Sequence, residues 1–508
     1  MNIIDSVMLG FSVALEPVNL FYCFLGVLLG TLIGVLPGLG SAGAIALLLP
    51  ITYQMSPTSG IIMLAGIWYG SMYGGSTTSI LLRIPGESAS VMTCVDGFEM
   101  ARRGRAGAAL GIAAFGSFIA GMLGLVGLVM LAPPLAEFAL DFGPPEYFAL
   151  ALLGLTLVSY LGAESSPAKA LSMALLGLLL ACVGLDPVRS EERFAFGSLS
   201  LQGGIELVPM VMGLFGVSQL LLLVQAPSSA PELLEEPRGL RALLPNRSEW
   251  RLASGAIARG SVLGFLVGLL PGAGSTISSF AAYAYEKRRS PHPERFGQGA
   301  IEGVAAPESA NNSATASGFI PLLTLGLPAN AVMALMLGAF MLHGITPGPT
   351  LLSQRPDMFW GVIASMVVGN IMLLGLNLPL IGLFARLARL PSIYIVPIIA
   401  VACVIGAYGV NNNPLDILVM LIFGVFGYYA ERFGFSLAPL VLGFVLGPMV
   451  EMSLRQSLVI SDGSFGIFVE RPISGILLAA AALMLLFPLF RFFKVWRAGR
   501  GAVAPLAE

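Results

Sequence analysis

Long apolar stretches recur along the whole chain and are separated by short polar ones. The clearest cover residues 20–36, 106–131, 147–161, 205–224, 359–383, 415–429 and 473–490. A helix of about 20 apolar residues crosses the hydrocarbon core of a bilayer, so each stretch predicts a membrane helix. With the shorter segments between them, the pattern predicts on the order of a dozen crossings, some of them re-entrant.

Composition agrees with this pattern. Of 508 residues, 56% are hydrophobic and only 11% are charged, and the mean hydropathy is +0.87. Soluble domains carry roughly 25% charged residues. We therefore expect an all-α, multi-pass membrane protein in the lipid bilayer. The net charge of −2 and the scattered basic residues argue against nucleic acid as a partner.

One motif occurs twice. "GVLLGTLIGVLPGLGS" at 26–41 and "GSVLGFLVGLLPGAGS" at 260–275 share ten of sixteen positions. A weaker pair follows in the same order, "GGSTTSILLRIPGE" at 74–87 and "SGFIPLLTLGLPAN" at 317–330. The chain is therefore interpreted as an internal duplication. We expect a first membrane repeat at 1–225, a Pro-, Ser- and charge-rich linker at 226–250, a second repeat at 251–490 and a tail at 491–508.

The repeated motif combines two features. Its glycines four residues apart fall on one helix face and allow another helix to approach closely. Its P-G-x-G-S ending predicts a broken helix near the middle of the membrane, because Pro37 and Pro271 interrupt the helical hydrogen bonds. The following glycines permit left-handed backbone, and a serine can cap the next helix. These residues are Gly38, Gly40 and Ser41 in the first copy, and Gly272, Gly274 and Ser275 in the second.

Paired interruptions in two repeats indicate the binding site of a transporter, since irregular backbone at membrane depth is tolerated only inside protein or along a cavity. The free N–H groups of the new helix would face an anion. The alternative is a kink with a packing role only.

A polar stretch, "EGVAAPESANNSATASG" at 302–318, contains no basic residue. Amides and hydroxyls can bind a carboxylate and can also supply the oxygen ligands of an alkali cation, so Glu308, Asn311 and Asn312 join Ser76 and Thr77 as candidate substrate or ion ligands. The alternative is an ordinary exposed loop. Glu302 and Glu308 would be coupling-ion or proton sites at bilayer depth, or would simply lie at the interface.

Several chemistries lack their signatures. The chain has no G-x-x-x-x-G-K-[ST] phosphate loop, its two histidines form no zinc motif, and its four cysteines are far apart. We expect no cofactor, metal or catalytic residue. An enzyme acting on a lipid-linked substrate would show clustered aspartates or a His–Glu pair, and a channel would favour a symmetric pore. A secondary transporter therefore fits best, with these two as alternatives.

Longer motifs resemble a known family. "GVLPGLGS", "YGSMYGGSTTSILLRIPGE", "DGFEMARRGRAGAALGIAAFGSF", "GAIEGVAAPESANNSATASGFIPLLTLGLP" and "RFGFSLAPLVLGFVLGPMVE" are similar to the large permease subunit of the tripartite tricarboxylate transporters, over residues 26–476. The resemblance implies a permease of the bacterial inner membrane that takes up tricarboxylates or related organic acids by symport. It also implies a small membrane subunit, a periplasmic solute-binding protein and Na⁺ or H⁺ as the coupling cation.

One residue departs from the family's expected pattern, since Arg83 stands where an Asn before I-P-G is expected. It would either hold a substrate carboxylate bidentately or mark the cytoplasmic end of a helix.

The basic residues predict the orientation of the two repeats. Short cytoplasmic loops carry an excess of Lys and Arg, and the strongest clusters occupy different positions in the repeats. They are Arg102, Arg103 and Arg105 in the first, and Lys287, Arg288, Arg289 and Arg295 in the second. We therefore expect inverted repeats, with a periplasmic N-terminus and a cytoplasmic tail.

Overall fold

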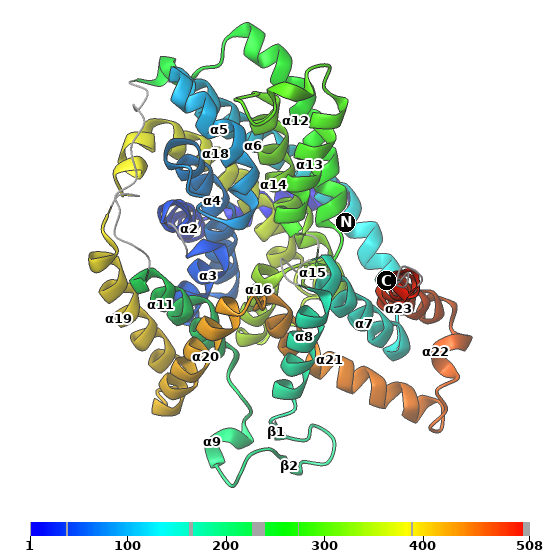
Figure 1. Cartoon of the computed structure of the whole chain (residues 1–508). Coiled ribbons are helices and arrows are strands. Elements are labelled where there is room, and N and C mark those ends of the chain that lie inside the picture. Colours follow the sequence, from blue (N-terminus) through cyan, green and yellow to red (C-terminus); the bar gives the residue numbers. More distant parts are fainter. Residues whose placement is uncertain are drawn as a thin grey trace, which may run out of the picture.

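The computed structural model describes residues 2–36, 39–161, 166–225, 239–272, 274–387 and 390–500. It is helical apart from one short hairpin (Figure 1). This agrees with the predicted all-α class. Pro37 and Gly38 of the first motif lie outside the described residues, as does most of the predicted linker. The C-terminal helix continues to Arg500, into the predicted tail.

The elements of the N-terminal half are α1 (Ile3–Ala14), α2 (Pro17–Val35), α3 (Gly40–Thr52), α4 (Pro57–Leu82), η1 (Ser88–Ser90), α5 (Val91–Met100), η2 (Ala101–Arg105), α6 (Ala106–Ala139), α7 (Pro144–Leu161), α8 (Pro167–Ala181), β1 (Gly184–Leu185), β2 (Glu192–Arg193), α9 (Leu199–Gln202), α10 (Leu207–Val211), η3 (Met212–Val217) and α11 (Ser218–Gln225).

The elements of the C-terminal half are η4 (Leu240–Leu243), α12 (Arg247–Gly268), α13 (Gly274–Arg289), η5 (Pro293–Arg295), α14 (Glu302–Ser317), α15 (Phe319–Leu325), α16 (Ala331–Leu342), α17 (Leu351–Gln354), α18 (Pro356–Leu387), α19 (Ser392–Asn411), α20 (Pro414–Arg432), α21 (Ala438–Ile460), α22 (Ile467–Glu470) and α23 (Pro472–Arg500).

Many of these helices suit a membrane. In the described part of the chain, seven helical segments are long and apolar enough to cross a bilayer, and six shorter apolar helices accompany them. All seven apolar stretches found in the sequence fall on helices. The chain is therefore a multi-pass membrane protein. The number of crossings stays a prediction.

The motif glycines bring pairs of helices into backbone contact. A Cβ added at Gly26, Gly30 or Gly34 of α2 would lie 2.3 Å from a carbonyl oxygen of α4, those of Met63, Ile67 and Ser71. Gly260, Gly264 and Gly268 of α12 face Ala306, Ala310 and Ala314 of α14 in the same way, at 2.1 to 2.6 Å. The close helix approach predicted from the glycine spacing is confirmed in both copies. Residue numbers rise together in each pair, so each pair is parallel.

The helices α4 and α14 run in opposite directions where they meet. Ser76, late in α4, contacts Glu308, early in α14, at 2.7 Å. Trp68, earlier in α4, packs on Phe319 at the start of α15, with ring centroids 5.4 Å apart. The helix pair α2–α4 and the helix pair α12–α14 therefore pack against each other in opposite directions at the centre of the molecule.

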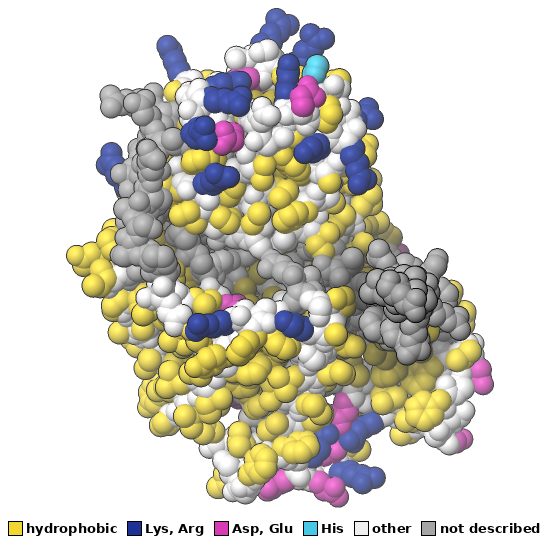
Figure 2. Space-filling view, viewed as in Figure 1, with side chains coloured by type: hydrophobic (Ala, Val, Ile, Leu, Met, Phe, Trp, Pro, Cys, Tyr) yellow, Lys and Arg dark blue, Asp and Glu magenta, His cyan; other side chains and the backbone are white. Residues whose placement is uncertain are grey.

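Both basic clusters lie at the same end. Asp96 of α5 accepts hydrogen bonds from the backbone N–H groups of Gly297, Gly299 and Ala300, which precede α14, each at 2.8 Å. Arg105 pairs with Glu249 of α12. The end that carries α5, α12 and α13 in Figure 1 shows gathered Lys and Arg side chains in Figure 2, above a largely hydrophobic surface.

The hairpin β1–β2 projects beyond the helices at the opposite end (Figure 1). Asp186 fastens it, accepting hydrogen bonds from Arg455 of α21 at 2.7 and 3.0 Å and from the N–H groups of Val188 and Arg189. The pKa of Asp186 is lowered, chiefly by the Arg455 hydrogen bonds and then by these two N–H groups. The hairpin is thus held to α21 by an ionised carboxylate.

Candidate substrate and ion site

The second P-G-x-G-S motif interrupts the helical path, as predicted. The helix α12 ends at Gly268, and α13 begins at Gly274 after a short irregular segment. Gly272 and Gly274 have φ of +84° and +55°, which only glycine adopts readily. The N–H of Gly272 donates to the carbonyl of Ala329 at 2.6 Å. This break is therefore held against the segment that precedes α16.

The first motif also separates two helices, since α2 ends at Val35 and α3 begins at Gly40 with φ of +58°. The predicted serine caps are wrong. Leu39 occupies the N-cap position of α3, and Ser41 already lies in the first turn. Ser275 likewise lies inside α13. The hydroxyl of Ser41 instead donates to Oε2 of Glu87 at 3.3 Å.

The segment around Glu87 links the two breaks. A Cβ at Gly86 would lie 2.1 Å from the carbonyl oxygen of Gly34, at the end of α2. Ser88 shares a 2.8 Å hydrogen bond with Thr276 of α13, and Ser279 of α13 donates to Ala89 O at 2.7 Å. Residues of the first motif and of α13, the helix that begins at the end of the second motif, therefore contact one short segment that carries a buried carboxylate.

Asn311 is an unsatisfied polar group of this region. It is fully buried, and neither atom of its amide has a hydrogen-bond partner. The amide interacts with the Glu87 carboxylate, but without hydrogen-bond geometry, and Oε1 of Glu87 is also unpartnered. Buried polar groups in native proteins are nearly always satisfied by protein, water or a ligand. These atoms therefore form an incomplete polar site beside the breaks.

Glu308 lies at the meeting point of four helices. Its carboxylate is fully buried and accepts hydrogen bonds from Ser76 of α4 at 2.7 Å, from Ser117 of α6 at 3.3 Å, and from Thr93 of α5. Asn312 completes this hydroxyl cluster by donating to Ser117 Oγ at 2.7 Å and to the carbonyl of Glu308 at 3.0 Å. The polar stretch at 302–318 is thus a buried helix and not an exposed loop. Glu302, at its start, is only half-buried.

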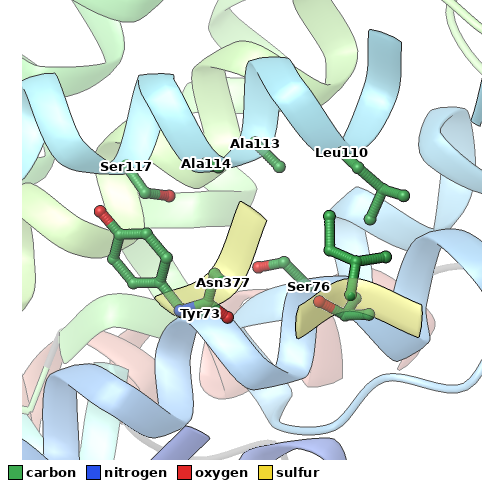
Figure 3. A pocket seen from close by; sticks show the side chains of 9 residues that line it. Tyr73, Ser76, Leu110, Ala113, Ala114, Ser117 and Asn377 are labelled. Atoms are coloured by element: carbon green, nitrogen blue, oxygen red, sulfur yellow. The ribbon is translucent and has the colours of Figure 1, made fainter. Parts of the chain in front are cut away.

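A small cavity adjoins this cluster (Figure 3). It has a volume of about 20 Å³, and its polar lining comes from Tyr73, Ser76, Thr77, Ser117 and Asn377. The side chains of Tyr73 and Ser76 on α4 and of Ser117 on α6 lie around it in the close-up. Tyr73 also donates to Asn370 of α18 at 3.0 Å. Such a volume holds about one water-sized particle.

Arg83 lies apart from both polar groups. It is exposed, and its guanidinium lies 5.6 Å from the ring centroid of Phe98. It lines an open pocket with Pro85, Cys94 and Glu99 at the end of the molecule where α5 lies. This position agrees better with a marker of a helix end than with a ligand beside Asn311.

The candidate residues thus divide into two groups. Gly40, Ser41, Gly272, Gly274, Ser275 and Asn311 lie at or near the breaks, whereas Ser76, Thr77, Glu308 and Asn312 lie at the hydroxyl cluster. Sequence reasoning missed Glu87, Thr93 and Ser117. Glu87 carried one signal, because the weaker repeat pair aligns it with Asn330, beside Gly274. Thr93 carried none, and Ser117 lay in the family motif at 96–118 without a feature that marked it as a ligand.

Comparison with known proteins identifies the family. Residues 20–442 match the model of the tripartite tricarboxylate transporter TctA family. The chain belongs to this family. It is therefore a transporter subunit and not an enzyme, and the family name implies further subunits.

Two relatives come from Agrobacterium vitis. An uncharacterized 52.8 kDa protein in the TAR-I ttuC' 3'region is 50% identical over 494 residues, which cover 97% of this chain and 98% of the relative. An uncharacterized protein in the TAR-II ttuC' 3'region is 52% identical over 215 residues, 42% of this chain and 89% of the relative. No solved structure matches the chain.

Proposed function

We propose that this member of the TctA family is the permease subunit of a cation-coupled secondary transporter. It takes up a tricarboxylate or a related organic acid delivered by a periplasmic solute-binding protein, together with a small membrane subunit, in a bacterial inner membrane. The observation that carries the proposal is the meeting of two broken-helix segments beside the unsatisfied amide of Asn311.

The substrate site lies between the two breaks. The first turns of α3 and α13 direct unpaired backbone N–H groups and positive dipole ends toward an anion. The hydroxyls of Ser41 and Ser275 and the amide of Asn311 supply further donors. Gly40 and Gly274 leave room for the substrate, because a Cβ at Gly40 would have no neighbour within 4 Å. Ser76, Thr77, Glu308 and Asn312 hold the coupling cation nearby.

The two halves are inverted repeats in this proposal. Two parallel helix pairs, α2 with α4 and α12 with α14, use the same glycine positions, and α4 runs antiparallel to α14. In addition, the C-cap residues of α4 and α15, Arg83 and Gly326, both have left-handed backbone. These equivalences support an inverted duplication of the kind found in many transporters.

The orientation follows from charge. The end that carries both basic clusters is cytoplasmic in this proposal, and the end that carries β1 and β2 is periplasmic. The helix α4 contains 26 residues, or roughly 39 Å at 1.5 Å per residue. That length exceeds the hydrocarbon core of about 30 Å, and in this proposal residues 57–82 cross the membrane.

Uptake of radiolabelled citrate into vesicles tests the function. Vesicles containing the chain and the small subunit, supplied with the binding protein, should accumulate citrate when a Na⁺ or proton gradient is imposed. Omission of any one component should leave little uptake. Full saturable uptake by the chain alone would contradict the three-part mechanism. Absence of gradient-driven uptake of citrate and of other di- and tricarboxylates by the complete system would contradict the proposed function.

A further inference from the structure

The Glu308 carboxylate is buried without a cationic partner. Within the described residues no Lys or Arg pairs with it. The titratable groups that interact with it are Tyr73 of α4, Glu87 before η1 and Cys94 of α5, none of which carries a positive charge. An ionised carboxylate inside a membrane protein is costly unless it is neutralised. Glu308 therefore needs a positive charge that the described side chains do not supply.

Its surroundings suit a small cation. Three hydroxyls, of Ser76, Thr93 and Ser117, point their oxygens at the carboxylate. A hydroxyl can donate to a bare carboxylate and can rotate to present its lone pairs to a cation. The cavity of about 20 Å³ beside Ser76 and Ser117 offers room for one ion-sized particle without rearrangement of the helices.

We propose that the carboxylate of Glu308, with the hydroxyls of Ser76, Thr93 and Ser117, is the binding site of the coupling cation, a monovalent ion that is either Na⁺ or a proton. This site is separate from the organic-acid site at the helix breaks. The inference rests on the proposed function, because it assigns one of the two ligands of that transport cycle to particular atoms.

The neighbours Asn311 and Asn312 mark the separation between the two sites. The amide nitrogen of Asn312 donates within the cation cluster, to Ser117 Oγ and to Glu308 O. Asn311 has no hydrogen-bond partner and interacts with Glu87 near the break at Ser41. In this proposal Asn312 positions the ligands of the cation, whereas Asn311 binds the organic acid.

Coupling follows from the helices that supply the ligands. Glu308 and Asn311 lie one turn apart on α14, while the three hydroxyls belong to α4, α5 and α6. A bound cation draws α14 against these three helices and fixes Asn311 relative to the breaks. Cation binding thus prepares the organic-acid site.

The first test compares Glu308→Gln with the wild-type complex in citrate-loaded and empty vesicles. Glu308→Gln should abolish uptake driven by a cation gradient while citrate exchange between equal concentrations persists, because exchange requires no net cation movement. Glu137→Gln, at an exposed position of α6, is the matched control and should behave as wild type. A Na⁺ gradient at equal pH, and a pH gradient without Na⁺, identify the cation.

The second test separates the two asparagines. Asn312→Ala should raise the cation concentration for half-maximal uptake by about 10-fold, the usual effect of losing a group that orients a metal ligand. At saturating cation concentration, its citrate dependence should be nearly unchanged. Asn311→Ala should do the reverse. Thr93→Val should act like Asn312→Ala, and Thr93→Ser, which keeps the hydroxyl, should not.

The outcomes distinguish this inference from the proposed function. If the wild-type complex shows gradient-driven uptake but Glu308→Gln retains it with the same cation dependence, the cation site is wrong and the transport function stands. If both asparagine variants change the same half-saturation, the separation of the two sites is wrong. A wild-type complex without gradient-driven uptake contradicts the proposed function itself.

Discussion

Arg83 and Gly326 occupy the same backbone position at the ends of α4 and α15. Their φ angles are +58° and +68°, and each precedes a proline by two residues. The following N–H group returns to a carbonyl six residues earlier in both cases, from Ile84 to Thr78 at 3.5 Å and from Leu327 to Pro321 at 3.1 Å. A left-handed residue of this kind commonly ends a helix. Arg83 thus has a backbone conformation that glycine adopts more readily than any other residue.

The first prediction concerns Arg83→Gly. Left-handed backbone costs a non-glycine residue about 1–2 kcal/mol, and the exposed contact with Phe98 returns about 0.5–1 kcal/mol. Arg83→Gly should therefore leave stability unchanged or raise it by up to about 1 kcal/mol, whereas Arg83→Ala should lower it. The citrate concentration for half-maximal uptake should not change in either variant. A marked increase in this citrate concentration in both variants would identify Arg83 as a substrate contact.

The second prediction concerns helix packing. The Cβ of Gly264→Ala would lie 2.1 Å from the carbonyl oxygen of Ala310, and such overpacking costs about 1–3 kcal/mol or more. Gly264→Ala should lower the midpoint of thermal unfolding in detergent. Gly375→Ala on α18, where the added Cβ would meet nothing within 4 Å, is the control and should unfold like the wild type. Equal midpoints of thermal unfolding for the two variants would contradict the close contact of α12 with α14.

The third prediction separates the glycines of the breaks. A Cβ at Gly272 would lie 2.4 Å from Cα of Val158, whereas Gly40 has open space and Gly274 has its nearest neighbour at 3.6 Å. Gly272→Ala should reduce the yield of folded protein. Gly40→Ala and Gly274→Ala should fold and lose citrate uptake. Gly104→Ala, at φ of +75° and without close neighbours, has the same backbone strain far from the site and should transport normally.

The fourth prediction concerns topology. In a cysteine-free background, Gln54→Cys, just before α4, should react with a membrane-impermeant maleimide added outside the cell. Ser290→Cys, just after α13, should react only after the membrane is permeabilised, because it adjoins the basic end. Equal labelling of the two positions from outside would contradict the inverted arrangement.

The fifth prediction concerns pH. The lowered pKa of Asp186 means that its bonds to Arg455 stabilise the hairpin above the unfolded pKa of about 4. This contribution is lost as the pH falls through the lower folded value. Protection of the amides of residues 184–193, taken relative to the intrinsic exchange rate at each pH, should therefore be high at neutral pH and should fall on strong acidification. In Asp186→Asn, exchange should be faster at neutral pH and should depend less on acid. Identical pH dependence of hydrogen exchange in the wild type and in Asp186→Asn would contradict the role of Asp186.

Features that rest on local spacing could be predicted from the sequence. Glycines four apart indicated helix contact, and both Gly272 and Gly274 adopt the left-handed backbone expected of them. The prediction of serine caps was wrong because a cap requires the helix start to be placed to within one residue. The residue that precedes α3 is Leu39 and not a serine.

Long-range contacts within the polar region could not be predicted. Thr93 and Glu308 are 215 positions apart, and Ser117 and Asn312 are 195 apart. Thr93 stands in no quoted motif, and Ser117 lies in the family motif at 96–118 without any spacing that marks it as a ligand. Only the packing of α5 and α6 against α14 brings them to the site. The polar stretch at 302–318 identified one side of the cluster, and the fold supplies the other side.

The glycine contacts also determine which parts of the molecule can move. Within each pair, sliding by a single residue would drive a larger side chain into a carbonyl that already leaves no room for a methyl group, as at Gly30 and Gly264. We therefore expect the pairs α2–α4 and α12–α14 to behave as two rigid units. If the centre opens to one side and then to the other, we expect one pair to turn against the other. The contact of Ser76 with Glu308 joins the two pairs and would lie between the moving parts.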